Sequence, residues 1–113
     1  MNMIEEIKAS VRMEIRPNSQ GTEYLEAVVD RNELESLQMI LTKHLGPAAK
    51  EPGKKANLPR EIQGLVDDLG GLRIEQSFFY KRVGTTLFYA ALWPWESNRK
   101  KITLKLGTGK LKS

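Results

Sequence analysis

Few residues in this chain have the type and spacing that catalysis or metal binding requires. His44 is the only histidine and cysteine is absent, so no thiolate metal site can form and a site built on one histidine is not expected. Asp67 and Asp68 are adjacent, but successive positions on a helix point about 100° apart, so these carboxylates do not face one another. We therefore predict a protein without a metal site or a cofactor, and we name no catalytic residue.

The segment Gly107-Thr108-Gly109-Lys110 resembles the end of a phosphate-binding loop. The motif G-x-x-x-x-G-K-[ST] requires a glycine where Leu104 stands, and a hydroxyl residue where Leu111 stands. No helix is expected to follow. We therefore reject a nucleotide-binding loop and interpret residues 107–113 as a flexible basic tail.

Trp93-Pro94-Trp95 is a conspicuous aromatic segment. Proline cannot donate a hydrogen bond to a strand ladder, and it favours an extended conformation at Trp93, so the segment marks the end of a strand or an edge. We interpret the two rings as an apolar plug that closes one end of the core. Stacking of a ligand on them is the alternative.

The net charge of +4 is distributed unevenly. Of the 18 basic and 14 acidic residues, six bases and no acids lie in residues 99–113, so residues 1–98 have a net charge of −2. A charge block of this kind indicates a solvated edge strand and tail, with binding of an anionic partner as the alternative.

Composition and length are those of one globular domain. The chain has 113 residues, of which 40% are hydrophobic and 28% charged, enough for one core but not for two. No apolar run reaches the roughly 18–20 residues of a membrane helix. Glu5 and Glu6 interrupt the stretch where a secretion signal needs apolar residues. We therefore predict a cytoplasmic protein with no membrane partner.

The N-terminal segment, residues 3–15, has two competing patterns. Ile4, Ile7, Val11 and Ile15 recur at helical spacing. The end of the same segment alternates apolar and charged residues, as a strand does. Helix and strand both remain open here, and residues 22–29 then predict a strand.

Two helices are predicted in the middle of the chain. Asp30 and Glu33 have the spacing of a capping box, so the first helix is expected to begin at Arg31 and to end before Gly46-Pro47. After a loop over residues 47–57, Asn57 and Pro59 indicate the start of the second. Its apolar stripe and its end are formed by Ile62, Leu65, Val66, Leu69 and Gly70-Gly71.

Leu72 to Leu106 predicts three consecutive strands joined by two short turns. A first loop at Val83-Gly84 places Phe78 opposite Tyr89, and a second at residues 96–99 places Trp93 opposite Ile102. With these registers one apolar face of the meander points into the core. That face comprises Ile74, Phe78, Tyr89, Trp93 and Leu104.

The second face of the meander carries the residues that we predict as a binding site: Phe79, Phe88, Leu92, Lys101 and Lys105. Three interpretations are open. The N-terminal helix covers this face, and its rings are ordinary core. Two copies of the chain associate through it. Single-stranded nucleic acid stacks on the rings while the lysines hold its phosphates, although no RNA-recognition or cold-shock signature is present.

These elements predict an α+β fold with a four-stranded, mainly antiparallel sheet, whose C-terminal part is the three-strand meander, and two or three helices packed mainly on one face. Residues 1–106 form a single domain, followed by the basic tail at 107–113. We predict a small non-catalytic cytoplasmic protein-interaction module that binds a protein partner or a second copy of itself as a homodimer. The alternatives are a single-stranded nucleic-acid-binding module and an enzyme with a pocket near Trp93, Trp95 and Tyr89.

Overall fold

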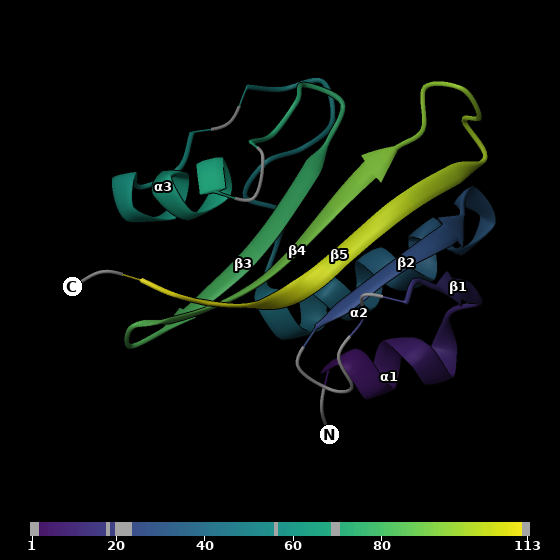
Figure 1. Cartoon of the computed structure of the whole chain (residues 1–113), viewed down its shortest axis with the longest axis horizontal. Helices are drawn as coiled ribbons and strands as arrows, with labels where there is room; N and C mark the ends of the chain where they lie inside the picture. Colours follow the sequence, from purple (N-terminus) through teal and green to yellow (C-terminus); the bar gives the residue numbers. More distant parts are fainter. Residues whose placement is uncertain (1–2, 18, 20–23, 56, 69–70, 112–113) are drawn as a thin grey trace.

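The computed structural model describes residues 3–17, 19, 24–55, 57–68 and 71–111. Within these residues, five strands form one antiparallel sheet in the order β1-β2-β5-β4-β3, accompanied by three α-helices (Figure 1). In chain order the elements are α1 (Met3–Ser10), β1 (Met13–Ile15), β2 (Leu25–Asp30), a 3₁₀ turn (Arg31–Glu33), α2 (Leu34–Leu45), α3 (Arg60–Asp68), β3 (Ser77–Val83), β4 (Thr86–Pro94) and β5 (Lys101–Lys110).

Helices cover parts of both faces of the sheet. α1 and α2 pack on one face and bury the larger cluster of apolar side chains. α3 packs against a second cluster on the opposite face, and Figure 1 shows it set apart from α1 and α2 with the sheet between them. The α+β class is as predicted, but the described part of the sheet has five strands instead of four.

The N-terminal segment contains a helix followed by a strand, so each of the two predicted patterns describes one part of it. α1 buries Ile4 and Ile7, as its helical spacing requires. The chain then changes to a strand, and β1 pairs with β2 so that Met13 lies opposite Val29. This short edge strand is the fifth strand that the prediction lacked. Of the predicted strand at 22–29, Thr22 and Glu23 lie outside the described residues.

The helical segment begins at Arg31 as predicted, but as a 3₁₀ turn that leads into α2 at Leu34. The predicted capping box is wrong, because Asp30 makes no side-chain hydrogen bond to this turn. The Glu33 carboxylate instead accepts the Arg12 backbone N–H at 2.8 Å, and Asp30 pairs with a lysine of β5. Partners distant in the sequence thus compete successfully with the local cap.

α1 and α2 are joined by a polar contact as well as by the core. The Glu6 carboxylate lies 3.0 Å from His44 Nε2 and 3.2 Å from Lys43 Nζ. Hydrogen bonds from His44 and then from Lys43 lower the pKa of Glu6 below its ordinary value of 4.5. α2 ends as predicted at Gly46, whose φ of 85° suits glycine.

α3 follows the predicted apolar stripe. It begins after Pro59, whose carbonyl accepts the N–H groups of Ile62 and Gln63, and it buries Ile62 and Val66. The predicted end of the stripe, Leu69 and Gly70, lies outside the described residues.

The first hairpin of the meander differs from the prediction in register but not in faces. The chain turns at Gly84-Thr85, where Gly84 has a φ of 61°, and Phe78 lies opposite Ala91 instead of Tyr89. Because side chains alternate with a period of two, this displacement by two residues leaves each of them on its predicted face.

The second hairpin overturns the predicted core face. Trp93 lies opposite Thr103 instead of Ile102, and this displacement by one residue moves every β5 side chain to the other face. Leu104 therefore packs under α1 and α2, while Tyr89 faces α3. The prediction of one buried face shared by Ile74, Phe78, Tyr89, Trp93 and Leu104 is wrong; Ile74 precedes β3 and is 48% exposed.

The apolar pattern could not fix this register because both faces of the central strands are covered. In β4 the side chains toward α2 and those toward α3 are all apolar, so alternation carries no signal. The first set is Phe88, Ala90 and Leu92, and the second is Leu87, Tyr89 and Ala91.

The predicted tail is strand as far as Lys110, and Leu111 is buried. Its glycines have a packing role. A Cβ on Gly109 would lie 2.9 Å from Leu65 Cδ2 of α3, and one on Gly107 would lie 3.0 Å from the Tyr24 ring and from Tyr89 Oη. Close approach of neighbouring side chains therefore accounts for the glycine pattern that resembles a phosphate-binding loop.

Candidate functional site

The five residues predicted as a binding site do not form one surface. Phe79 and Leu92 are buried in the core under α1 and α2, with 3% and 2% of their surface exposed, and Phe88 packs against the same core. Lys101 and Lys105 lie on the opposite face, because β5 is displaced by one residue from the predicted register. The first interpretation of the rings, as ordinary core beneath helices, therefore describes their position.

The face of the sheet that bears α3 is only partly covered. α3 packs over β3, β4 and the last residues of β5. The same face continues over β1, β2, the first half of β5 and the end of β4, and we call this surface the open half-face. By alternation and strand pairing its side chains are those of Glu14, Glu26, Val28, Asp30, Trp93, Lys101, Thr103 and Lys105, of which Val28 is itself buried beneath its neighbours.

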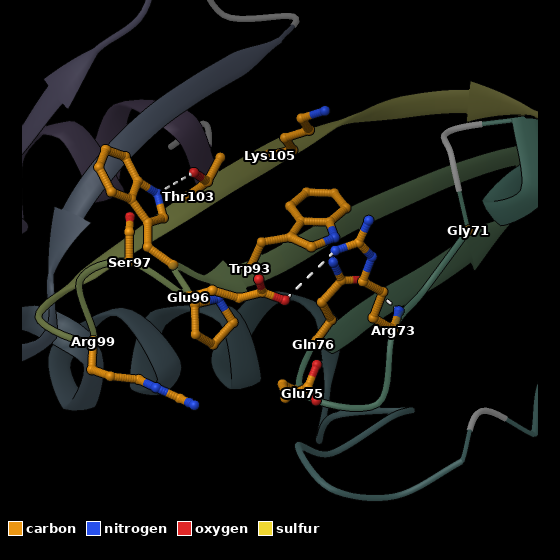
Figure 2. Close-up of a pocket in the computed structure, with 12 residues that line it drawn as sticks. Gly71, Arg73, Glu75, Gln76, Trp93, Glu96, Ser97, Arg99, Thr103 and Lys105 are labelled. Atoms are coloured by element: carbon orange, nitrogen blue, oxygen red, sulfur yellow. Dashed lines mark hydrogen bonds and ion pairs between the residues drawn. The ribbon is translucent and has the colours of Figure 1, made fainter.

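A groove borders the open half-face where β4 ends. It has a volume of about 870 Å³, within the range of ligand sites. The tryptophan segment and the turn after it form one side, and the segment between α3 and β3 forms the other (Figure 2). The groove is lined by Gly71, Arg73, Glu75, Gln76, Trp93, Pro94, Trp95, Glu96, Ser97, Arg99, Thr103 and Lys105.

Both tryptophan rings are held in place by β5. Trp95 Nε1 donates a hydrogen bond of 2.8 Å to Thr103 Oγ1. The Lys105 ammonium lies 4.9 Å from the centroid of the Trp93 ring, within the distance of a cation–π contact. Figure 2 shows Trp93 between Lys105 and the Arg73–Glu96 ion pair. Both rings are partly buried, so each keeps some surface for a partner.

Charges on the open half-face are arranged in two opposite stripes. β2 contributes acids and β5 contributes bases, and they pair across the ladder: Lys101 Nζ lies 3.0 Å from Asp30, and Lys105 Nζ lies 3.9 Å from Glu26. An exposed pair such as Lys101–Asp30 contributes little to stability, about 0–1 kcal/mol, whereas the Lys105–Glu26 pair is partly buried. The two pairs neutralise two of the six bases that the sequence concentrates at the C-terminal end, Lys101 and Lys105.

The far wall of the groove is fixed by a buried lysine. Lys50 is 3% exposed, and its ammonium donates to the carbonyl groups of Glu51, Ile74 and Gln76 at 3.1, 2.9 and 2.6 Å. Gln76 Oε1 in turn accepts the Arg73 N–H at 2.6 Å. Burial lowers the pKa of Lys50, and the negative charge of Glu75 opposes this shift.

The ionisable side chains of the groove are carboxylates and cations. Among the residues that line it, Glu75 and Glu96 are acidic, and there is neither histidine nor cysteine. Within the described residues no group of three or more histidine, cysteine and acidic side chains could hold a metal ion. Burial, followed by a hydrogen bond to Glu26, raises the pKa of Tyr24, and burial raises that of Tyr89, so both phenols stay protonated.

Sequence reasoning identified the two tryptophans but missed the residues that position them. Lys50 stood in a polar loop beside two other lysines, and nothing local distinguished it. The pairing of β2 with β5 did have a signal: acids at positions 26 and 30 match bases at 105 and 101. Opposite charges at matching intervals could have suggested that these strands are neighbours.

No protein-family model, curated protein or solved structure matches this chain. None of the helices in the part of the chain that the structure describes is long and apolar enough to cross a membrane.

Proposed function

We propose that the protein is a non-catalytic module that binds another polypeptide on the open half-face, with Trp93 and the adjoining Trp95 among the contacting residues. The observation that carries this proposal is two partly exposed tryptophans that are already ordered by Thr103 and Lys105. Tryptophan is enriched among the residues that contribute most to protein interfaces. Rings fixed before binding lose little conformational freedom when a partner arrives.

The charge pattern favours a polypeptide over nucleic acid. A stacked base needs a free ring face, and the Lys105 ammonium already lies over Trp93. Phosphate groups approaching Lys101 or Lys105 would also meet Asp30 and Glu26. A protein surface, which carries charges of both signs, is compatible with such alternating stripes.

Photo-crosslinking in the cells that produce the protein tests this proposal. A photoreactive phenylalanine derivative replaces Glu14, which is 73% exposed on the open half-face, or, as a control, Met39, which is 69% exposed on α2 on the other side of the sheet. We expect a polypeptide adduct that survives nuclease treatment from position 14 and none from position 39. A nuclease-sensitive adduct, equal adducts at both positions, or none at position 14 would each contradict the proposal.

A further inference from the structure

We infer that the polypeptide bound on the open half-face is a second copy of this chain. Two copies stack face to face, related by a twofold axis that runs parallel to the strands between β2 and β5. This inference rests on the proposed function and names its partner. It is derived from the order in which acidic, basic and aromatic side chains cross the sheet.

Strand pairing places the side chains of the open half-face in rows. One row contains Asp30 and Lys101, and the same row continues to Trp95, whose N–H donates to the Lys101 carbonyl. The next contains Glu14, Val28, Thr103 and Trp93. A third contains Arg16, Glu26, Lys105 and Ala91. Acids therefore lie on β1 and β2, bases on β5, and tryptophans at the end of β4.

A twofold axis parallel to the strands places β2 of one copy opposite β5 of the other. Each residue keeps its position along the strand direction, so each row faces the same row of the second copy. Asp30 then faces Lys101 of the second copy, and Glu26 faces Lys105 of the second copy. Each charge keeps its partner in its own chain and gains an opposite charge across the interface. Stacked sheets normally align their strands within about 30°, as this arrangement requires.

The other in-plane twofold axis, perpendicular to the strands, is unfavourable. It would place each strand opposite the same strand of the second copy, and the first row of one copy would face the third row of the other. Asp30 would then face Glu26 of the second copy, and Lys101 would face Lys105 of the second copy. Like charges placed opposite one another are repelled, so the charge pattern selects the parallel axis.

The same operation places the aromatic end of β4 opposite β1. Trp93 faces Glu14 of the second copy, with Arg16 of that copy in the next row, so the ring meets long side chains with aliphatic stems and a cation. Trp95 lies in the row of Asp30, where β1 contributes no strand residue, since that strand starts only at Met13. Its indole N–H donates to Thr103, so the ring lies against β5, and no strand of the second copy lies opposite its row.

The size of the surface predicts a weak dimer. Four strands about 4.8 Å apart and three rows of side chains about 7 Å apart give a flat area of roughly 400 Å² per copy. Stable interfaces bury about 800 Å² per partner. We therefore expect a concentration-dependent equilibrium with a dissociation constant on the order of 100 µM, in the range of transient contacts.

Sedimentation analysis of the wild-type chain and charge-reversal variants tests the inference. We expect Lys101→Glu and Asp30→Lys each to raise the dissociation constant by about tenfold or more, because each places like charges across the interface. An equimolar mixture of these two variants should associate again, since two acids then face two bases. Lys81→Glu, at an exposed position of β3 on the other face, is the matched control and should behave as wild type.

Circular dichroism establishes that each variant is folded, which the exposed position of both side chains leads us to expect. A wild-type chain that stays monomeric up to about 1 mM would overturn the inference. So would variants that do not associate again when mixed, or a Lys101→Glu variant that dimerises as wild type does. If the chain is monomeric but the Glu14 position still crosslinks to a different polypeptide, the homodimer is refuted and the proposed function stands.

Discussion

Replacing Lys50 by methionine tests how the groove is held open. The substitution keeps an unbranched apolar side chain but removes the ammonium that three carbonyl groups share. A hydrogen bond to a charged group contributes about 1.5–3 kcal/mol, and the cost of burying the lysine charge offsets part of that sum. We therefore expect Lys50→Met to reduce the free energy of unfolding by about 2–4 kcal/mol, the range of a buried polar group left without its partner.

Thermal unfolding followed by circular dichroism measures this loss. In a chain of this size each kcal/mol corresponds to about 4 °C in Tm, so Lys50→Met should lower Tm by about 8–16 °C. Lys54→Met is the control, because Lys54 is exposed and its ammonium pairs with the exposed Glu51; it should change stability by less than about 0.5 kcal/mol. If the two variants have the same Tm, the three carbonyl contacts are not stabilising and the reasoning is wrong.

Three further predictions concern the rest of the fold. Phe79→Ala should reduce the free energy of unfolding, measured in urea, by about 3–5 kcal/mol, because the ring is buried in the core. A reduction below about 1 kcal/mol would show that the ring is not buried. Gly109→Val should cost about 1–3 kcal/mol by displacing Leu65 and should speed hydrogen exchange in α3, whereas unchanged exchange would contradict the close contact. The hydrogen bond from His44 lowers the pKa of Glu6, so this carboxylate contributes stability above its ordinary pKa of 4.5 and loses it as pH falls through the lowered value. Glu6→Gln should therefore flatten the decline in urea midpoint below that pH, and an unchanged pH profile would refute the contact.

The elements that sequence reasoning predicted correctly are those with a signal on one face only. The stripe of α3 repeats apolar residues at helical spacing above a polar outer side, and Gly84 has the positive φ expected of a hairpin turn. β4 has no such contrast, because helices cover both of its faces, and the register of β5 was therefore wrong by one residue. Because of this one-residue difference, Lys101 and Lys105 lie on the open half-face and not on the face of Phe79, where they were predicted.

The groove depended on contacts that no local pattern encodes. Trp93 and Trp95 are conspicuous in the sequence, which predicts an apolar plug but not the neighbours that hold the two rings. The residues that order them come from β5, and the opposite wall is held by Lys50 through carbonyl groups more than twenty positions away. Backbone carbonyl partners leave no trace in residue type, so only the folded chain brings them together.

The contact between two open half-faces can be observed most directly by intermolecular paramagnetic broadening. The chain has no cysteine, so Glu14→Cys carries a single spin label. Such spin-labelled chains, at natural isotope abundance, are mixed with ¹⁵N-labelled wild-type chains, so that only contacts between copies broaden the signals. We predict that the Trp93 and Trp95 indole N–H signals broaden as concentration rises. Indole signals that stay sharp up to about 1 mM, or broadening confined to α1 and α2, would contradict the account.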